Sequence, residues 1–312
     1  MTASPKDIAV LKAWNRTAPG NAGTSVHTLI DRQCRGQPEA AALAVHLKNM
    51  HVGPEQFVPL CFGKSQWTTV AMPAVMKAGA AFVLLDLSYS SPRLQESCTL
   101  VRLNIILCSQ QHTAKAQHLA SAVVSVDAEA GHNWRSHQVG QLRSTVQSSN
   151  ALYAVFTALA YIKAGGLDAQ MRALQFSSYG FDVSISDTLV TLLAGGCICV
   201  PSDLERSNDL PGAVARMDVN FADLTPSVLQ SLSPADVPSI RTLVLCGEAM
   251  SQTIIAKWGG QVCLLNAYGP AESCMLSTLQ PNVSMIDPSN IGYATGGACW
   301  VVDKADARSG SC

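Results

Sequence analysis

The stretch "RTLVLCGEAMSQTIIAKWGGQVCLLNAYGP", residues 241–270, carries the clearest sign of the fold class. An apolar run ends in a polar turn, apolar residues at helical spacing follow, and a pair of glycines precedes a second apolar run. Short apolar runs bounded by turns are typical of buried strands, and glycine is typical of a helix C-terminus. The stretch therefore predicts strand, helix and strand in succession, which is the unit of a parallel α/β sheet.

The same pattern occurs in two earlier parts of the chain. Residues 66–88 predict a helix that Gly79 ends as its C-cap, followed by a strand that leads to Asp86. Residues 184–203, "SISDTLVTLLAGGCICVPSD", repeat this order. Further strands are predicted for short β-branched or apolar runs at residues 57–62, 104–108, 122–126 and 152–157. Together these elements predict one or two large sheets flanked by helices.

Composition and charge limit the kind of protein that this chain can be. Its 312 residues are 48% hydrophobic and 14% charged, which is enough apolar material for one large globular domain or two. The 21 basic and 22 acidic residues form no Lys/Arg cluster, so we expect small molecules or proteins as partners rather than nucleic acid or membranes. The N-terminus has no signal pattern and no apolar run is long enough to span a bilayer, which predicts a cytoplasmic protein.

Cysteines and histidines do not predict a metal site. The 11 cysteines are an odd number spread along the chain, which favours reduced thiols over a disulfide framework. The one close pair, in "GGCICVPSD", has no second ligand pair beside it. His46 and His51, like His132 and His137, are five residues apart, whereas two ligands on one helical face need three or four. We therefore expect no zinc, and we expect these histidines at the surface or in loops.

A lone carboxylate follows the last predicted strand, in "LLNAYGPAES", residues 264–273. Ligands of open parallel sheets bind beyond the carboxyl ends of the strands. Gly269 would permit close backbone approach there, Pro270 would stiffen the turn, and Glu272 would present an oxygen ligand for Mg²⁺ on a nucleotide's phosphates. The alternative is a solvated glutamate after an ordinary Gly-Pro turn, and from this stretch alone that alternative is favoured.

A second acid lies in "LQFSSYGFDVSISD", residues 174–187. Asp182 follows Phe181 directly, at the predicted start of a helix. An aspartate at this position is typical of an N-cap. The functional alternative is a buried carboxylate that binds the ammonium group of a substrate. The residues alone favour the N-cap.

Nine segments of the chain occur in a telling order. They are "LKAW", "SVHTLIDRQCRGQPEA", "VGPEQFVPLCFGKSQWTTVAMPAVMKAGAAFVLLDLS", "FSSYGFDVS", "GGCICVPSD", "LTPSV", "TLVLCGEAM", "NAYGPAES" and "NIGYATGGACWVVD". In these segments the chain resembles the adenylation domains of nonribosomal peptide synthetases, most closely the fungal ones, within the adenylate-forming (AMP-dependent synthetase/ligase) superfamily. The resemblance runs from about residue 8 to about residue 305, and nine matches in order make coincidence very rare.

The resemblance implies a fold and a reaction. The fold is α/β, the large N-terminal core of an adenylate-forming enzyme, with mixed or parallel sheets flanked by helices and without the C-terminal lid domain. In the family, the carboxylate of an amino acid attacks the α-phosphate of ATP to give aminoacyl-AMP, and the acyl group then passes to a carrier protein in secondary-metabolite biosynthesis. The implied cofactors are ATP and Mg²⁺, and the implied partners are an amino acid and other synthetase domains.

The resemblance also assigns residues by position. Asp182 would bind the α-ammonium group of the amino acid, and the pocket for its side chain would be lined by Val183, Ser186, Asp223, Val244, Cys246, Ala267, Met275 and Leu276. Asp223 is the charged exception in this set and favours a polar or cationic substrate side chain. The nucleotide would lie against Gly247, Asn266, Ala267, Tyr268, Gly269 and Glu272, of which Glu272 would hold Mg²⁺.

The chain departs from the family pattern mainly at phosphate-binding positions. The Ser/Thr/Gly-rich phosphate loop expected after Thr157 is missing, and Lys163 does not match the lysine of that loop. Ala271 stands where the family has a phosphate-contacting threonine, and residues are also missing near position 42. The lid with its catalytic lysine is absent, so no catalytic residue is assigned. The resulting organisation is a first part of the core at 1–126, a polar connection at 127–150, a second part at 151–305, and a truncated tail at 306–312.

These departures predict a truncated domain whose adenylation activity is lost or severely impaired. Loss of one preorganised donor typically lowers the rate on the order of 10²- to 10³-fold, and several are missing here. We therefore expect weak ATP binding and a pseudoenzyme. One alternative is a noncatalytic amino-acid-binding or scaffold protein associated with a synthetase, and another is a fragment of a longer active synthetase from a faulty gene model. An acyl-CoA synthetase or luciferase-like relative is disfavoured because Asp182 marks amino-acid selection in the family.

Overall fold

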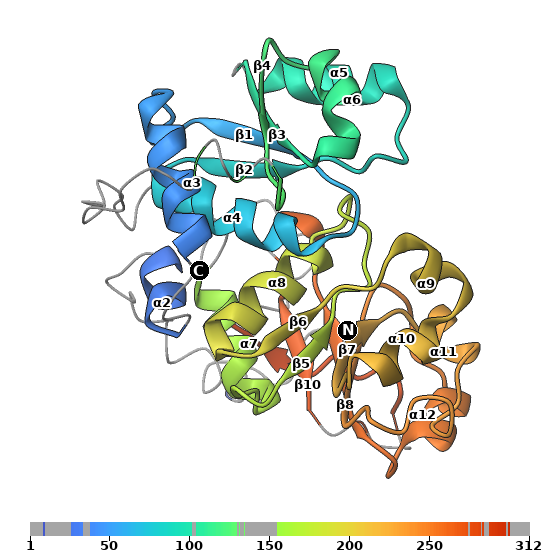
Figure 1. The fold of residues 1–312 in the computed structure, drawn as a ribbon. Helices are drawn as coiled ribbons and strands as arrows, with labels where there is room; N and C mark the ends of the chain where they lie inside the picture. Colours follow the sequence, from blue (N-terminus) through green and yellow to red (C-terminus); the bar gives the residue numbers. More distant parts are fainter. Residues whose placement is uncertain are drawn as a thin grey trace.

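The structure of the chain is a computed structural model with two β-sheets and the helices that cover them (Figure 1). It describes residues 26–33, 38–101, 104–129, 155–273, 275–281 and 287–297, together with the single positions 9, 131, 134, 283 and 299. Most of the predicted connection 127–150 and all of the predicted tail 306–312 lie outside the described residues. Within the described part of the chain, no helix has the length and apolar character needed to cross a bilayer.

The first sheet has four parallel strands in the order β2-β1-β3-β4. Its strands are β1 (Phe57–Cys61), β2 (Ala81–Leu84), β3 (Ile105–Cys108) and β4 (Ala122–Ser125). Helices α3 (Pro38–Asn49) and α4 (Gln66–Ala78) pack on one face, and α5 (Ser91–Leu100) and α6 (Thr113–Gln117) on the other. Both faces are therefore buried, which explains why these strands are almost continuously apolar.

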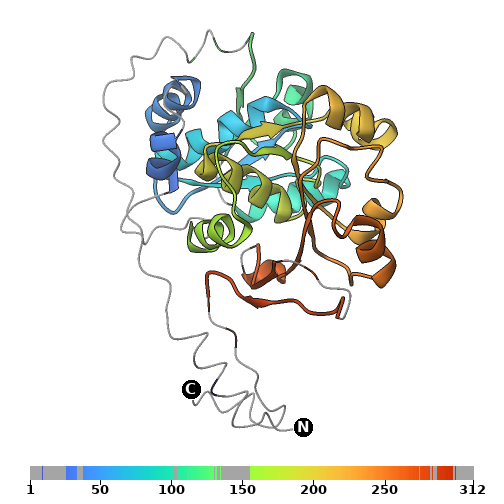
Figure 2. The same ribbon diagram turned by 90° about the horizontal axis from the view of Figure 1, so that it is seen from below.

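The second sheet has seven strands in the order β11-β10-β9-β8-β7-β5-β6. Five are parallel, whereas β10 and β11 pair antiparallel at one edge, so the sheet is mixed. Both of these edge strands belong to the orange-to-red end of the chain in Figure 2. The strands are β5 (Arg172–Leu174), β6 (Cys197–Cys199), β7 (Phe221–Leu224), β8 (Thr242–Leu245), β9 (Cys263–Tyr268), β10 (Thr278–Gln280) and β11 (Tyr293–Ala294). The α/β fold with parallel and mixed sheets is confirmed.

Two groups of helices cover the second sheet and give it a core on each face. One group consists of α2 (Val26–Gln33), α7 (Val155–Gly165) and α8 (Val183–Ala194). The other consists of α9 (Asp203–Asn208), α10 (Leu210–Arg216), α11 (Pro226–Gln230) and α12 (Gln252–Trp258). Two short 3-10 turns, η1 (Gln110–His112) and η3 (Ala271–Ser273), lie in loops. Met76 of α4 belongs to the same apolar cluster as α7 and α8, so the two halves of the molecule are packed together.

Helix α4 ends as the sequence predicts. Gly79 has φ 104°, in the left-handed region, and its amide donates to the carbonyl of Met76 at 3.1 Å. The amide of Ala80 donates to the carbonyl of Val75 at 3.1 Å, which completes a Schellman C-cap. Glycine adopts a positive φ without the steric penalty of a side chain, so this residue places β2 directly after the helix.

The predicted strand at residues 152–157 is wrong over its described part. Residues from Val155 onward form α7 instead, and 152–154 lie outside the described residues. Ala158, Tyr161 and Ile162 recur at three- and four-residue spacing and pack in the cluster that includes α8. The helical period continues to Gly165 without a turn residue, and this longer pattern outweighs the short β-branched run. The strands predicted at 57–62, 104–108 and 122–126 are confirmed.

Candidate functional site

A cavity of about 460 Å³ lies at the carboxyl ends of the parallel strands of the second sheet. The chain leaves β5 toward β6 and leaves β7 toward β8, so neighbouring β5 and β7 form a switch point of the sheet. Loops diverge at such a point and leave a crevice, which is where ligands of open α/β sheets bind. The cavity is lined by the loops after β5, β7, β8 and β9, by the first turn of α8, and by Tyr161 of α7.

Eight of the nine predicted substrate-binding positions line this cavity. They are Asp182, Val183, Ser186, Asp223, Cys246, Ala267, Met275 and Leu276. Val244 does not line it, because its side chain is fully buried in the core beneath the sheet's carboxyl edge. The sequence pattern therefore brings together residues up to 94 positions apart, from Asp182 to Leu276.

The predicted nucleotide positions are divided between the cavity and its surroundings. Gly247, Ala267, Tyr268 and Gly269 line the cavity. Asn266 is buried on β9, where its side-chain amide donates to the carbonyl of Asn290 at 2.9 Å. Glu272 is exposed on η3, outside the lining. Asn266 thus positions a loop by hydrogen bonding, whereas Glu272 presents its carboxylate to solvent.

Gly269 allows the loop after β9 to lie close to the next segment. A Cβ at this position would lie 2.7 Å from the Cα of Leu276 and 2.7 Å from the carbonyl oxygen of Met275. Both contacts are to backbone, which cannot rotate away as a flexible side chain can. Any other residue would therefore push apart the two segments that form this wall of the cavity.

Asp182 occupies the N-cap position of α8, but its side chain makes no capping hydrogen bond. Its Oδ2 atom is buried and has no hydrogen-bond partner among the described residues. Burial raises the pKa of Asp182, the nearby Glu272 adds to this, and backbone hydrogen bonds oppose it. The structure therefore does not support the N-cap interpretation and leaves an acceptor oxygen available at the cavity wall.

A second carboxylate lies at the buried end of the cavity. Asp223 on β7 is 5% exposed; the hydroxyl of Tyr161 donates to its Oδ2 at 3.4 Å and the thiol of Cys246 donates to its Oδ1 at 3.1 Å. Burial raises the pKa of Asp223 to about 7, although these two hydrogen bonds lower it and the charge of Asp182 raises it further. Hydrogen bonds lower the cost of burying a carboxyl, and both oxygens of Asp223 have a donor here.

Asp187, on the same helix as Asp182, is a third buried acid. It is 2% exposed, and neither of its carboxyl oxygens has a hydrogen-bond partner among the described residues. Burial raises its pKa well above the usual range, the charge of Asp223 adds to the rise, and Lys64 opposes it. Asp187 does not line the cavity, but the charge of Asp223 acts on it, as the charge of Asp182 acts on Asp223.

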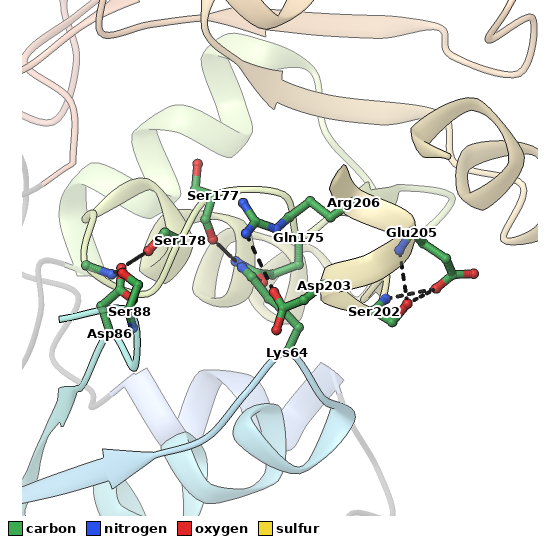
Figure 3. Close-up of polar contacts among 11 residues, drawn as sticks. Lys64, Asp86, Ser88, Gln175, Ser177, Ser178, Ser202, Asp203, Glu205 and Arg206 are labelled. Atoms are coloured by element: carbon green, nitrogen blue, oxygen red, sulfur yellow. Dashed lines mark hydrogen bonds and ion pairs between the residues drawn. The ribbon is translucent and has the colours of Figure 1, made fainter. Parts of the chain in front are cut away.

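The loop that leads into Asp182 is held against the first sheet by polar contacts (Figure 3). The ammonium group of Lys64, from the loop after β1, donates to the side-chain carbonyl of Gln175 and to the backbone carbonyl of Ser177. The hydroxyl of Ser178 donates to the carboxylate of Asp86, from the loop after β2. Charged donors and acceptors make the stronger hydrogen bonds, so these contacts fix the loop from both sides.

Lys64 is itself half-buried, with its ammonium group 4.4 Å from the centre of the Tyr179 ring. Burial lowers its pKa to about 8, and the charges of Asp187 and Asp86 oppose this. A second cavity of about 560 Å³ lies beside it, between the loops of the two sheets. The two cavities share Arg206, whose guanidinium lies 3.6 Å from Asp203.

A third, small cavity is lined by hydroxyl groups, and no charged side chain is among its described lining residues. Thr157 at the start of α7, Ser273, Ser277, Thr295 and two glycines line a small cavity of about 160 Å³. The hydroxyls of Ser277 and Ser273 are 2.7 Å apart, and Ser273 also donates to the carbonyl of Pro270 at 2.9 Å. Lys163 is exposed on α7 and does not line any of the three cavities. These hydroxyls are occupied with one another.

No group of three or more His, Cys, Asp or Glu side chains that could hold a metal ion occurs within the described ranges. Cys197 is exposed and Cys199 is buried, so the two do not share a ligand position. His51 is exposed, as the sequence predicts, whereas His46 is half-buried and His132 and His137 lie outside the described residues.

Sequence reasoning missed three residues of the site: Tyr161, Asp187 and Lys64. Asp187 carried a signal, since an acid in the apolar period of "SISDTLVTLLA" predicts either an exposed stripe or a buried carboxyl. The sequence did not identify Tyr161 as a site residue, because its segment follows a run that was interpreted as a strand. Lys64 carried no signal, because its partners lie more than 100 residues away.

A family model described as AMP-binding enzyme matches the chain at residues 37–157 and 145–309. Nonribosomal peptide synthase roqA of Penicillium rubens is 38% identical over 90% of this chain and 14% of its own length. D-lysergyl-peptide-synthetase subunit 2 of Epichloe festucae var. lolii is 39% identical over 96% of this chain and 26% of its own length. The chain thus spans about a quarter or less of these relatives.

The second of these alignments contains positions that this chain lacks. It extends over 345 residues, whereas the whole chain has 312. At least 33 positions of the relative, 345 less 312, therefore have no counterpart here. The family-model match is also interrupted, with its two segments meeting at residues 145–157.

Solved structures show the same fold. The nonribosomal peptide synthetase FmoA3 in its alpha-methyl-L-serine-AMP bound form superposes with a TM-score of 0.86 over 96% of this chain and 40% of its own, at 17% identity. VinN superposes with a TM-score of 0.73 over 88% of this chain and 81% of its own, at 14% identity. At these identities the likeness establishes the fold alone.

Proposed function

The chain belongs to the AMP-binding enzyme family, with the adenylation domains of nonribosomal peptide synthetases as its relatives, and we propose that it binds an amino acid but adenylates it poorly or not at all. The observation that carries the proposal is the cavity in which Asp182 and seven further substrate positions meet. We also propose the division into core parts at 1–126 and 151–305, with one sheet in each.

Asp182 is the proposed partner of the α-ammonium group. Its Oδ2 atom is buried and has no partner among the described residues, so this oxygen stays without a hydrogen bond until a donor arrives. An ammonium group would supply both a charge and hydrogen-bond donors. Hydrogen bonds that involve charged groups are stronger than those between neutral groups. The loop contacts of Lys64 and Asp86 hold the segment before Asp182 in place for this purpose.

The side chain of the amino acid would enter between Val183, Cys246 and Asp223. The cavity wall there is mainly apolar, and Asp223 is the charged exception at its buried end. This arrangement supports the interpretation that a polar or cationic side chain is preferred, because an apolar side chain would leave the cavity-facing side of a buried carboxyl without a partner.

ATP and Mg²⁺ are the cofactors that family membership suggests, and the residues fit them in part. Gly247, Tyr268 and Gly269 form an open wall beside the amino-acid end, suited to a flat base. Glu272 offers one exposed carboxylate, which matches the way Mg²⁺ is held by one or two carboxylates together with substrate phosphates. When bound, the metal would neutralise phosphate charge.

The phosphate-binding part of the proposed nucleotide site is the least complete. Helix α7 begins at Val155, so no Gly-rich loop separates Thr157 from the helix, and the longer alignments of the relatives support an internal loss. Ala271 offers no hydroxyl in the turn before Glu272. Positioned donors act together in a transition-state site, so their combined loss should leave little adenylation.

Two assays on the wild-type chain test this proposal. Exchange of pyrophosphate with ATP, measured with each proteinogenic amino acid, should give no signal above background. Calorimetry should detect an amino acid that binds the wild type but not Asp182→Ala. Robust exchange with any amino acid would refute the impairment, and equal binding by both proteins would refute the role of Asp182.

A faulty gene model is the alternative that the alignments also support. Coding sequence wrongly assigned to an intron would remove an internal loop from the protein. Sequencing of the full-length transcript tests it directly. Recovery of the phosphate loop after Thr157 would restore the interpretation of an active synthetase, with carrier-protein and other synthetase domains as its partners. A transcript that matches the 312 residues supports the impaired domain.

A further inference from the structure

Tyr161 lies outside every segment that the family resemblance assigns to substrate or nucleotide, yet it lines the amino-acid cavity. It projects from α7 and is 3% exposed. Its hydroxyl donates to one carboxyl oxygen of Asp223 at 3.4 Å, while the thiol of Cys246 donates to the other at 3.1 Å. The carboxyl of Asp223 is therefore held by two donors from two different elements.

These donors restrict how the carboxyl of Asp223 can rotate. Each carboxylate oxygen accepts about two hydrogen bonds, so one position on each remains after Tyr161 and Cys246 have bonded. Burial and the neighbouring charge of Asp223 raise the pKa of Tyr161 well above its usual range, which keeps its hydroxyl protonated and a donor. The remaining acceptor positions are available to a ligand in the cavity.

Three carboxyls lie around this end of the cavity. The charge of Asp182 raises the pKa of Asp223, and the charge of Asp223 raises the pKa of Asp187, so each lies within electrostatic reach of the next. Arg206 also lines the cavity, and its guanidinium lies 3.6 Å from Asp203. A ligand that brings a positive charge would stabilise the ionised form of Asp223, whereas an anionic ligand would destabilise it.

We propose that Tyr161 is a specificity-determining residue that, with Cys246, orients Asp223 to receive the side-chain ammonium of a basic amino acid. The inference rests on the proposed amino-acid binding and adds the substrate class and the residue that selects it. The α-ammonium group would meet Asp182, and the side-chain ammonium would meet Asp223. A substrate of the lysine and ornithine class satisfies both carboxylates at once.

Norleucine is the matched test ligand, because it has the straight chain of lysine without the terminal ammonium. Calorimetry at pH 8 should show L-lysine binding the wild type more tightly than L-norleucine, and a hydrogen bond between charged groups corresponds to roughly 10- to 100-fold. Tyr161→Phe keeps the ring and removes the hydroxyl, so it should reduce the lysine-to-norleucine preference at least about 5-fold while norleucine affinity stays unchanged.

Asp223→Asn provides a second, independent variant and should abolish the preference. Tyr293→Phe, which removes a half-exposed hydroxyl on β11, is the matched control and should leave it unchanged. Norleucine binding as tightly as lysine, or an unchanged preference in Tyr161→Phe, would overturn the inference while leaving the proposed amino-acid binding intact. Absence of binding by every amino acid tested would instead overturn the proposed function.

Discussion

The two ends of the candidate site differ in how they are built. The amino-acid end consists of side chains on α7, α8, β7 and the end of β8, where Asp223 and Tyr161 are buried in the core of the second sheet. The nucleotide end consists of turns, with Ala271 and Glu272 exposed on η3. Core side chains cannot change without a loss of packing, whereas surface loops can be shortened at little cost in stability. A chain under no selection for adenylation would therefore lose its phosphate contacts first.

The largest effect is expected at Asp182, where the two ends meet. Asp182→Ala should lower the affinity for a bound amino acid roughly 30- to 1,000-fold, because it leaves the ligand's ammonium without its buried partner. Calorimetry against the wild type measures this change. Asp209→Ala, which removes the exposed acid that caps α10, is a suitable control and should leave the affinity unchanged. A loss of less than about 3-fold in Asp182→Ala would place the ammonium site elsewhere.

The affinity for lysine should depend on pH, because lysine binds the ionised form of Asp223. Burial raises the pKa of Asp223 to about 7; the hydrogen bonds from Cys246 and Tyr161 lower it, and the charge of Asp182 raises it. A cationic side chain binds the ionised form, so the affinity for lysine should rise with pH by up to about 10-fold per unit below pH 7 and level off above it. The affinity for norleucine should not show this pH dependence, because norleucine has no side-chain ammonium group. Lysine affinity that is constant between pH 5.5 and 8 would contradict the assignment.

A smaller effect is expected on stability. Between the ordinary pKa of an aspartate and about 7, the folded chain holds a proton on Asp223 that the unfolded chain releases, so this residue's contribution to stability falls as pH rises through that window. Asp223→Asn removes this contribution. The melting temperature of Asp223→Asn minus that of the wild type should therefore increase by a few degrees as the pH is raised from 5 to 8. A difference between the two proteins that does not change with pH would contradict the buried, protonatable carboxyl.

The smallest effect is expected at the nucleotide end. Ala271→Thr adds the hydroxyl that the family pattern has there, but it supplies neither a phosphate loop nor a charged donor. Exchange of pyrophosphate with ATP should therefore stay at background, and the affinity for an amino acid should change less than about 2-fold. Measurable exchange in this variant would show that one hydroxyl, rather than the loop after Thr157, limits the reaction.

The sequence predicted the fold and the residues that line the cavity better than it predicted α7. Glycine-terminated helices followed by apolar strands carry a local signal, as at Gly79, and the structure confirms it. The assigned pocket residues come together because parallel strands end at one edge of a sheet. Val155–Thr157 was misassigned because its short β-branched run continues into a helix. The contact between Tyr161 and Asp223 joins residues 62 positions apart, so no local sequence pattern predicts it.

The central claim is that the amino-acid end functions while the nucleotide end does not. Titration of L-lysine into the wild-type chain by calorimetry, with and without Mg²⁺ and ATP in the cell, tests both halves in one measurement. The account predicts the same saturable isotherm in both conditions. An additional heat of reaction, or a marked gain in apparent affinity when Mg²⁺ and ATP are present, would contradict the claim that the nucleotide end does not function. The absence of binding heat would contradict the assignment of lysine, and its absence with every amino acid would contradict the amino-acid site.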